Sequence, residues 1–195
     1  MKFRFAWAVA AIACLCAPAT AQQPVMPQSE FEMRTVLTDP DSGRQFDMEV
    51  RHRGGIFRMQ GEFEGQDAIA LLDHEREVTT ILINMHGMRM AMEMPHGEGI
   101  DLPLPEEEAL IEIIGNDVVA GEPCTVYRVE DDDVPGGEAH GCLTDDSIVL
   151  RVEVPGRGTL MEATHFARTP QDASLFTIPP GYQVMQMPSG MGFPR

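Results

Sequence analysis

The fold is decided by residues 31–51, which read FEMRTVLTDPDSGRQFDMEVR. In each half of this stretch apolar and charged side chains alternate with a period of two, which is typical of a β-strand with one buried face and one solvent-exposed face. The halves are joined by Asp39-Pro40-Asp41-Ser42-Gly43, whose residues favour turns. Residues 31–51 therefore predict an antiparallel β-hairpin.

The same alternation recurs in residues 57–63, 88–94 and 148–154. Further strands are predicted at 68–72 and 78–85, which are more continuously apolar, and at 118–129 and 159–168, with glycine- and proline-containing turns between them. Many short strands, each with one apolar face, indicate a mainly β protein built as a curved antiparallel sheet or an unclosed β-barrel. The alternation fits a packed interior and an open cavity equally well.

One segment has a different pattern. Residues 105–114 begin at Pro105, continue with three glutamates and stop before Gly115. Proline and acidic residues are favoured in the first turn of a helix, and glycine is favoured just after its end. We expect one short helix over residues 105–114, lying against the sheet.

The N-terminus has the features of a secretory signal peptide. Lys2 and Arg4 precede an apolar run over residues 5–17, and Ala19-Thr20-Ala21 matches the cleavage pattern. The run is shorter than the roughly 20 residues that span a bilayer. We therefore predict a signal peptide at 1–21, a flexible lead-in at 22–29, a single domain at 30–195, export to the periplasm and no membrane-spanning segment.

The charge balance excludes several classes of function. The chain has 14 basic and 31 acidic side chains, which gives a formal net charge of -17. Such a field repels nucleic acid, which is bound through clustered Lys and Arg. Lys2 is the only lysine, so the exported protein would have no lysine for Schiff-base or phosphate chemistry.

Two cysteines remain once the signal peptide is removed, Cys124 and Cys142. An even pair in an exported protein favours a disulfide. A metal site that uses both thiolates and His140 is the alternative, but the spacing matches no zinc motif.

Most of the chain after the predicted signal peptide resembles a known family. The resemblance is carried by residues 121–127 (GEPCTVY), 150–154 (LRVEV), 161–164 (MEAT) and most specifically 172–182 (DASLFTIPPGY). These segments resemble a family of exported bacterial proteins of unassigned function that is similar to the periplasmic lipoprotein carriers LolA and LolB. The resemblance implies an unclosed antiparallel barrel with a helical lid over a hydrophobic cavity, and it implies no activity.

The apolar faces of the predicted strands supply a candidate ligand cavity. Methionine is flexible and polarisable, so methionine-rich surfaces accommodate ligands of varied shape. The candidate lining residues are Phe31, Met33, Met48, Phe57, Met59, Phe63, Met90 and Met92. We expect a non-catalytic protein without a cofactor that binds a lipid or the acyl chain of a lipidated protein. Nucleophile-elbow, metalloprotease and dinucleotide motifs are absent from the sequence.

Two alternatives remain open. Thioethers bind soft ions such as Cu(I), and Met88, Met90, Met92 and Met94 alternate between His86 and His96. Same-face residues on one strand are about 6.6 to 6.8 Å apart, so three sulfurs on one ion require a neighbouring strand or a bend. The other alternative is an envelope interaction protein with a filled core. The sequence does not specify an oligomeric state.

Overall fold

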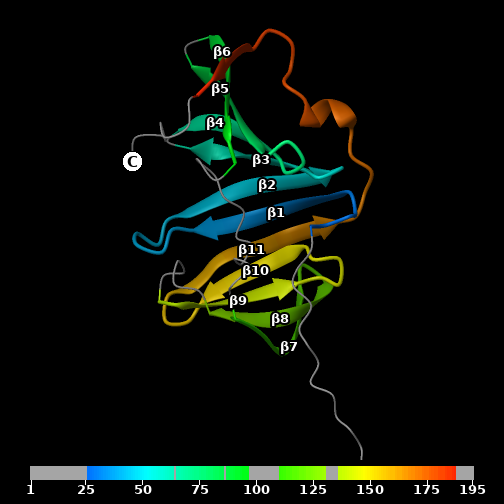
Figure 1. The fold of residues 1–195 in the computed structure, drawn as a ribbon. Coiled ribbons are helices and arrows are strands. Elements are labelled where there is room, and N and C mark those ends of the chain that lie inside the picture. The colour runs from blue at the N-terminus through cyan, green and yellow to red at the C-terminus, as the bar shows by residue number, and fades with distance from the viewer. Residues whose placement is uncertain (1–25, 64, 86, 97–109, 131–135, 188–195) are drawn as a thin grey trace, which may run out of the picture.

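Twelve strands form one sheet in the computed structural model, which describes residues 26–63, 65–85, 87–96, 110–130 and 136–187 (Figure 1). The strands are β1 (Phe31–Thr38), β2 (Gln45–Arg53), β3 (Ile56–Phe63), β4 (Gln66–Asp73), β5 (Val78–Met85), β6 (Met88–Pro95), β7 (Leu110–Val119), β8 (Glu122–Glu130), β9 (Glu138–Leu143), β10 (Val149–Val154), β11 (Gly158–Ala167) and β12 (Gln183–Gln186). Their order across the sheet is β12-β6-β5-β4-β3-β2-β1-β11-β10-β9-β8-β7.

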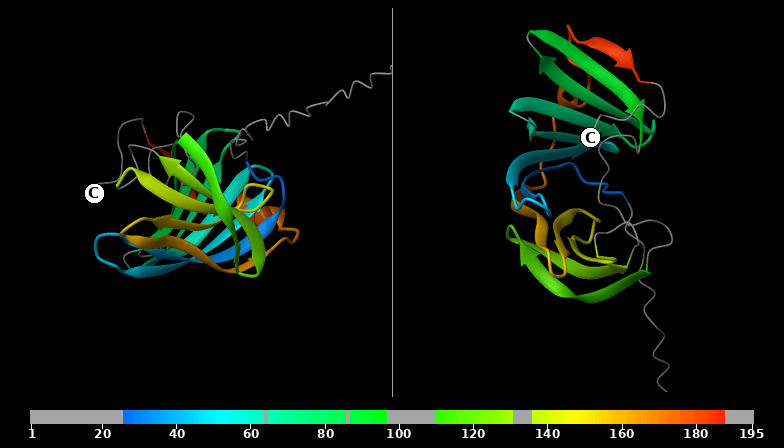
Figure 2. Two further views of the ribbon diagram at one scale, coloured as in Figure 1. Left: turned by 90° about the horizontal axis from the view of Figure 1, so that it is seen from below. Right: turned by 90° about the vertical axis from the view of Figure 1, so that its left-hand side faces the viewer.

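The sheet is strongly curved and does not close. Figure 2 shows it bent into an open half-barrel, with β12 at one edge and β7 at the other. Every pair of neighbours is antiparallel except β6 and β12, which are parallel. The prediction of a mainly β protein with an unclosed, curved sheet is confirmed.

The period-two alternation places one set of side chains on the inner, concave face. In β1, Phe31, Met33 and Thr35 are buried, whereas Arg34 is exposed. The inner core continues across the sheet through Val50, Phe57, Ala70, Leu72, Val119, Cys124, Cys142, Ile148, Leu150 and Ala163. This core joins strands from both halves of the chain because β1 pairs with β11.

The outer face is covered over β4–β6 by the C-terminal segment. Leu71, Leu82 and Ala91 are buried there and pack against Ile178 and Tyr182. The segment begins after β11, forms a 3-10 helix η1 (Ala173–Phe176) capped by the Asp172 side chain, and then adds β12 beside β6. The strands β4 and β5 are therefore buried on both faces, which explains their nearly continuous apolar sequence.

The prediction of a helix at 105–114 is wrong for residues 110–114, the part that the structure describes. Residues from Leu110 onward belong to β7, which pairs with β8 and has a bulge between Ile113 and Gly115. The segment is rich in β-branched residues, which favour strands, and the ladder with β8 satisfies its backbone. Residues 105–109 lie outside the described ranges. In the parts of the chain that are described, η1 is the only helix.

Residues 26–29, predicted as part of a flexible lead-in, are packed against the inner face. Met26 contacts the inner core, Pro27 is buried, and the Ser29 carbonyl accepts a hydrogen bond of 2.8 Å from His52 Nδ1. The predicted signal peptide, residues 1–21, lies outside the described residues.

The predicted disulfide is present. Cys124 on β8 and Cys142 on β9 are joined with a Cα–Cα distance of 5.5 Å. Both residues are buried in the inner core, with exposed fractions of 4% and 1%. The bond links two strands that are already paired through Val126 and Cys142.

Candidate ligand-binding site

An apolar cavity of about 60 Å³ lies in the inner face, where the middle strands curve toward one another. Its walls come from β1, β2, β3, β10 and β11, together with the segment before β1 and the turn before β10. The lining residues are Pro27, Phe31, Met33, Met48, Val50, Phe57, Met59, Ser147, Ile148, Val149 and Met161. Among the described residues that line the cavity, Ser147 is the single polar one.

Five of the predicted cavity residues line this cavity together, namely Phe31, Met33, Met48, Phe57 and Met59. They meet because β1, β2 and β3 are neighbours and Met33 and Met59 are both register partners of Val50. The alternation within each strand then puts all five on one face.

Two of the other predicted residues, Met90 and Met92, are not among the lining. Met90 and Met92 are on β6, which is separated from β3 by β4 and β5, so about 14 Å of sheet lies between them and the cavity. These two methionines therefore do not line this cavity. The side chain of Phe63 lies outside the described part of the structure.

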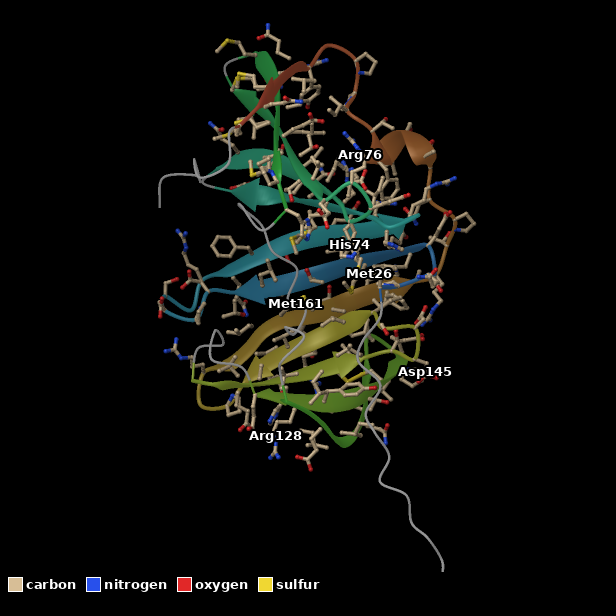
Figure 3. The ribbon with its side chains drawn as sticks, in the orientation of Figure 1. Met26, His74, Arg76, Arg128, Asp145 and Met161 are labelled. Atoms are coloured by element: carbon tan, nitrogen blue, oxygen red, sulfur yellow. A yellow bond between two sulfur atoms is a disulfide. The ribbon has the colours of Figure 1, made fainter. Side chains whose placement is uncertain are left out.

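Sequence reasoning missed the lining residues that come from the other half of the chain. Ile148, Val149 and Met161 reach the cavity because β11 pairs with β1 and β10 pairs with β11. In Figure 3 the labelled Met26 and Met161 both lie over the middle of the sheet, whereas Arg128 lies at its β7–β8 end. The alternation of 148–154 and its hairpin with 159–168 were visible in the sequence, but the pairing of β11 with β1 was not.

The cavity is smaller than most ligand sites. Small-molecule pockets typically have volumes of about 300 to 1,000 Å³, so the described cavity holds only part of such a ligand as it stands. Four of its lining residues are methionines, Met33, Met48, Met59 and Met161. Their unbranched side chains change rotamer readily, so the walls have a physical means of enlarging the cavity.

A buried histidine borders this apolar region. His52 is 1% exposed, and its ring is 5.6 Å from that of Phe31 and 4.7 Å from that of Phe57. Because a carbonyl only accepts, Nδ1 donates its proton to Ser29. Burial lowers the pKa of His52 against the opposing effect of that hydrogen bond, so the ring is neutral near pH 7. Nε2 is buried with no hydrogen-bond partner within the described residues.

Charged groups lie at the rim rather than in the walls. Asp146, next to Ser147, accepts hydrogen bonds from Arg168, which also pairs with Glu122. The bond from Arg168, together with one from Thr144, holds the pKa of Asp146 well below its usual value. This network connects the turn before β10 to the start of the C-terminal segment and fixes one end of the cavity.

The methionine stripe of β6 forms a second inner-face cluster. Met92 and Met94 are buried with Ile81, and Ile83 and Met187 pack against them. Met90 is half-buried and Met88 is 60% exposed. Of the two flanking histidines, His86 lies outside the described residues, and the ring of His96 is 5.9 Å from that of His74. No group of three or more His, Cys, Asp or Glu side chains in the described ranges is arranged to hold a metal ion.

Within the residues that the structure describes, no helix is both long enough and apolar enough to cross a membrane. No protein-family model and no curated protein sequence matches the chain.

Solved structures do match, and they define the class of fold. An uncharacterised conserved protein from Thermus thermophilus aligns over 82% of this chain and 91% of its own, with 11% identity and a TM-score of 0.57. PNGF-II aligns over 83% of this chain and 31% of its own, with 9% identity and a TM-score of 0.53.

A further similar structure is the MucA/MucB complex of Pseudomonas aeruginosa, at 16% identity and a TM-score of 0.52. The alignment covers 83% of this chain and 59% of the matched chain, so this chain spans about three fifths of that protein. MucB has a LolA-like fold. The predicted resemblance to the lipoprotein carriers is thus confirmed at the level of the fold.

Proposed function

We propose that this protein is an exported, non-catalytic binding protein that takes the acyl chain of a lipid, or of a lipidated protein, into the inner-face cavity. The observation that carries the proposal is the composition of the cavity wall. Ten of its eleven lining residues are apolar, and four of them are methionines. Each buried methylene of an acyl chain gains about 0.8 kcal/mol, and the methionines let the wall adapt as the chain enters.

The absence of paired polar groups in that wall supports a non-catalytic role. Nucleophilic catalysis needs a base within hydrogen-bond reach of the nucleophile. Of the lining residues that the structure describes, Ser147 is the only one with a hydroxyl group, and none is a histidine or a carboxylate. Location in the periplasm is supported by the signal-like residues 1–21 and by the disulfide, which suits an oxidising compartment.

A protein segment is the second candidate ligand. The favouring observation is the solved complex of MucB with MucA, in which a protein of this fold has a protein partner. An apolar side chain of a partner would use the same cavity, because the wall offers apolar contact and almost no hydrogen bonding.

Binding of a fluorescent fatty acid such as cis-parinaric acid tests the acyl-chain proposal. Met48, half-buried in the cavity wall, is changed to glutamate, and Met88, 60% exposed and outside the wall, is changed in the same way as a matched control. We expect Met48→Glu to weaken binding at least ten-fold, because a carboxylate in an apolar wall opposes burial of the chain. Met88→Glu should leave the affinity unchanged.

Circular dichroism melting shows whether both variants remain folded. If a folded Met48→Glu protein binds the fatty acid as tightly as the wild type, the acyl chain does not occupy this cavity. If the wild type binds no fatty acid and its native mass spectrum carries no lipid adduct, the acyl-chain proposal is overturned and the protein-segment candidate replaces it.

A further inference from the structure

The strand β12 brings a second row of methionines to the stripe on β6. The two strands are parallel, and Met185 is the register partner of Met92. The backbone amide of Met187 donates to the Glu93 carbonyl at 2.8 Å, which continues the same register by one more pair. Register partners on adjacent strands point to the same face. Met92, Met94, Met185 and Met187 therefore form a two-by-two group on the inner face.

The four methionines of this group differ in how far they are exposed to solvent. Met92 and Met94 have exposed fractions of 8% and 4%, Met187 packs against their cluster, and Met185 is 45% exposed. An ion therefore has access at Met185 and buried sulfur atoms beyond it. The apolar neighbours Ile81 and Ile83 supply no competing oxygen or nitrogen ligand.

Methionines on one strand are too far apart to bring three sulfurs onto one ion, but methionines on adjacent strands are closer together. Same-strand neighbours are about 6.6 to 6.8 Å apart, but adjacent strands are only about 4.7 to 4.9 Å apart. A metal–sulfur bond is about 2.3 Å long, as for zinc, so two sulfurs on one ion lie within about 4.6 Å of each other. Methionine has three rotatable side-chain bonds, which allow the sulfurs of two cross-strand pairs to converge on one point.

We propose that Met92, Met94, Met185 and Met187 bind one Cu(I) ion. Thioethers are soft, uncharged ligands that select Cu(I), whereas Zn²⁺ and Cu(II) favour thiolate, imidazole or oxygen ligands. The ion's positive charge is not neutralised by these ligands, but the net charge of -17 of the chain attracts cations to it. The site is separate from the cavity assigned to the acyl chain, since none of its four methionines lines that cavity.

Competition against the Cu(I) chelator bicinchoninate, under anaerobic conditions, tests the proposal. The protein is purified from cells that express the full chain, and free thiols are alkylated so that no cysteine outside the disulfide binds the metal. Native mass spectrometry with Ag(I), a redox-inert soft ion, gives the stoichiometry. We expect one equivalent of either ion per chain.

Leucine substitutions then locate the ion, because leucine keeps the apolar volume of methionine and removes the sulfur. The double variants Met185→Leu/Met187→Leu and Met92→Leu/Met94→Leu should each weaken Cu(I) binding at least ten-fold. The matched control Met33→Leu/Met48→Leu changes two cavity methionines and should bind Cu(I) as the wild type does.

Any one of three results would overturn the site. The first is a wild type that leaves all Cu(I) with the chelator, and the second is a Met185→Leu/Met187→Leu protein that keeps wild-type affinity. The third is a cavity control that loses as much affinity as the β6 and β12 variants. Thermal unfolding of each variant confirms that a loss of binding is not a loss of fold. If the variant at the buried residues Met92 and Met94 does not fold, the Met185→Leu/Met187→Leu protein still tests the site, because its changes affect partly exposed side chains.

Discussion

Replacing both Cys124 and Cys142 with alanine should lower the free energy of unfolding by about 3 to 5 kcal/mol. The cysteines are 18 residues apart, and closing a loop of that length removes about 11 cal/mol/K of chain entropy from the unfolded state, or about 3 kcal/mol at 25 °C. Both residues are buried in the inner core, so the lost sulfur contacts add to this loss. The backbone pairing of β8 with β9 should keep the folded state unchanged.

Urea unfolding followed by far-ultraviolet circular dichroism measures this effect. Because the unfolded chain without the cross-link exposes more surface, the slope of the free energy against urea concentration should also rise. The wild type treated with a reductant provides a control that loses the bond without any substitution. A loss below about 1 kcal/mol, or a larger loss with an unchanged slope, would refute the argument that the bond acts mainly through the unfolded chain.

Three further changes test other parts of the structure. Arg168 is the main cause of the lowered pKa of Asp146 in the folded state. The ionised Asp146 therefore stabilises the folded protein above its unfolded pKa of about 3.9, and this stabilisation is lost as the pH falls below about 4. Asp146→Asn should make the free energy of unfolding depend less on pH in this acidic range, and an unchanged dependence would contradict the argument. Leu150→Ala, at a fully buried position, should cost about 2 to 5 kcal/mol in urea unfolding, and a cost under about 1 kcal/mol would mean that the inner core collapses around the gap. Gly61→Ala places a Cβ 3.1 Å from the Asp47 carbonyl oxygen of the neighbouring strand and should lower the melting temperature through a loss of about 1 to 2 kcal/mol; a stabilised variant would show that the strands separate easily there.

The strands were predictable because their signal is local. In residues 31–38 and 45–53 the buried positions are those that the alternation marks, including Phe31, Met33 and Val50. A strand with one buried face and one solvent-exposed face must have this period, because a shift by one residue would exchange the two faces. The disulfide was predictable for a different reason, since only one pair of cysteines follows the signal-like segment.

The error at residues 110–114 shows where local signals conflict. Pro105, the acidic residues and Gly115 resemble helix boundaries, whereas the β-branched residues between 111 and 119 favour a strand. The ladder with β8, which follows β7 after the two residues Ala120 and Gly121, decides the outcome. Exposure of Ile113 and Val118, at 49% and 61%, reflects the position of β7 at the sheet edge.

The candidate sites were only half predictable because each is made by a pairing that the sequence does not state. The cavity needs β11 beside β1, which places Met161 opposite Leu37 and lets it line the cavity together with Met33. The methionine group needs β12 beside β6, and residues 183–186 lie in a proline- and glycine-rich tail with too few residues to signal a strand.

The same residue type, methionine, therefore has two separable tasks in this chain. In the cavity, Met33 and Met48 contribute flexible apolar volume, and leucine restores the volume but not the flexibility. At the sheet edge, Met92 and Met185 contribute sulfur atoms, which leucine does not replace. Leucine variants at the two places should consequently differ, with Cu(I) binding lost only in the edge variants and fatty-acid binding retained by those edge variants. Loss of fatty-acid binding in the edge variants would instead make the two methionine groups parts of one apolar surface.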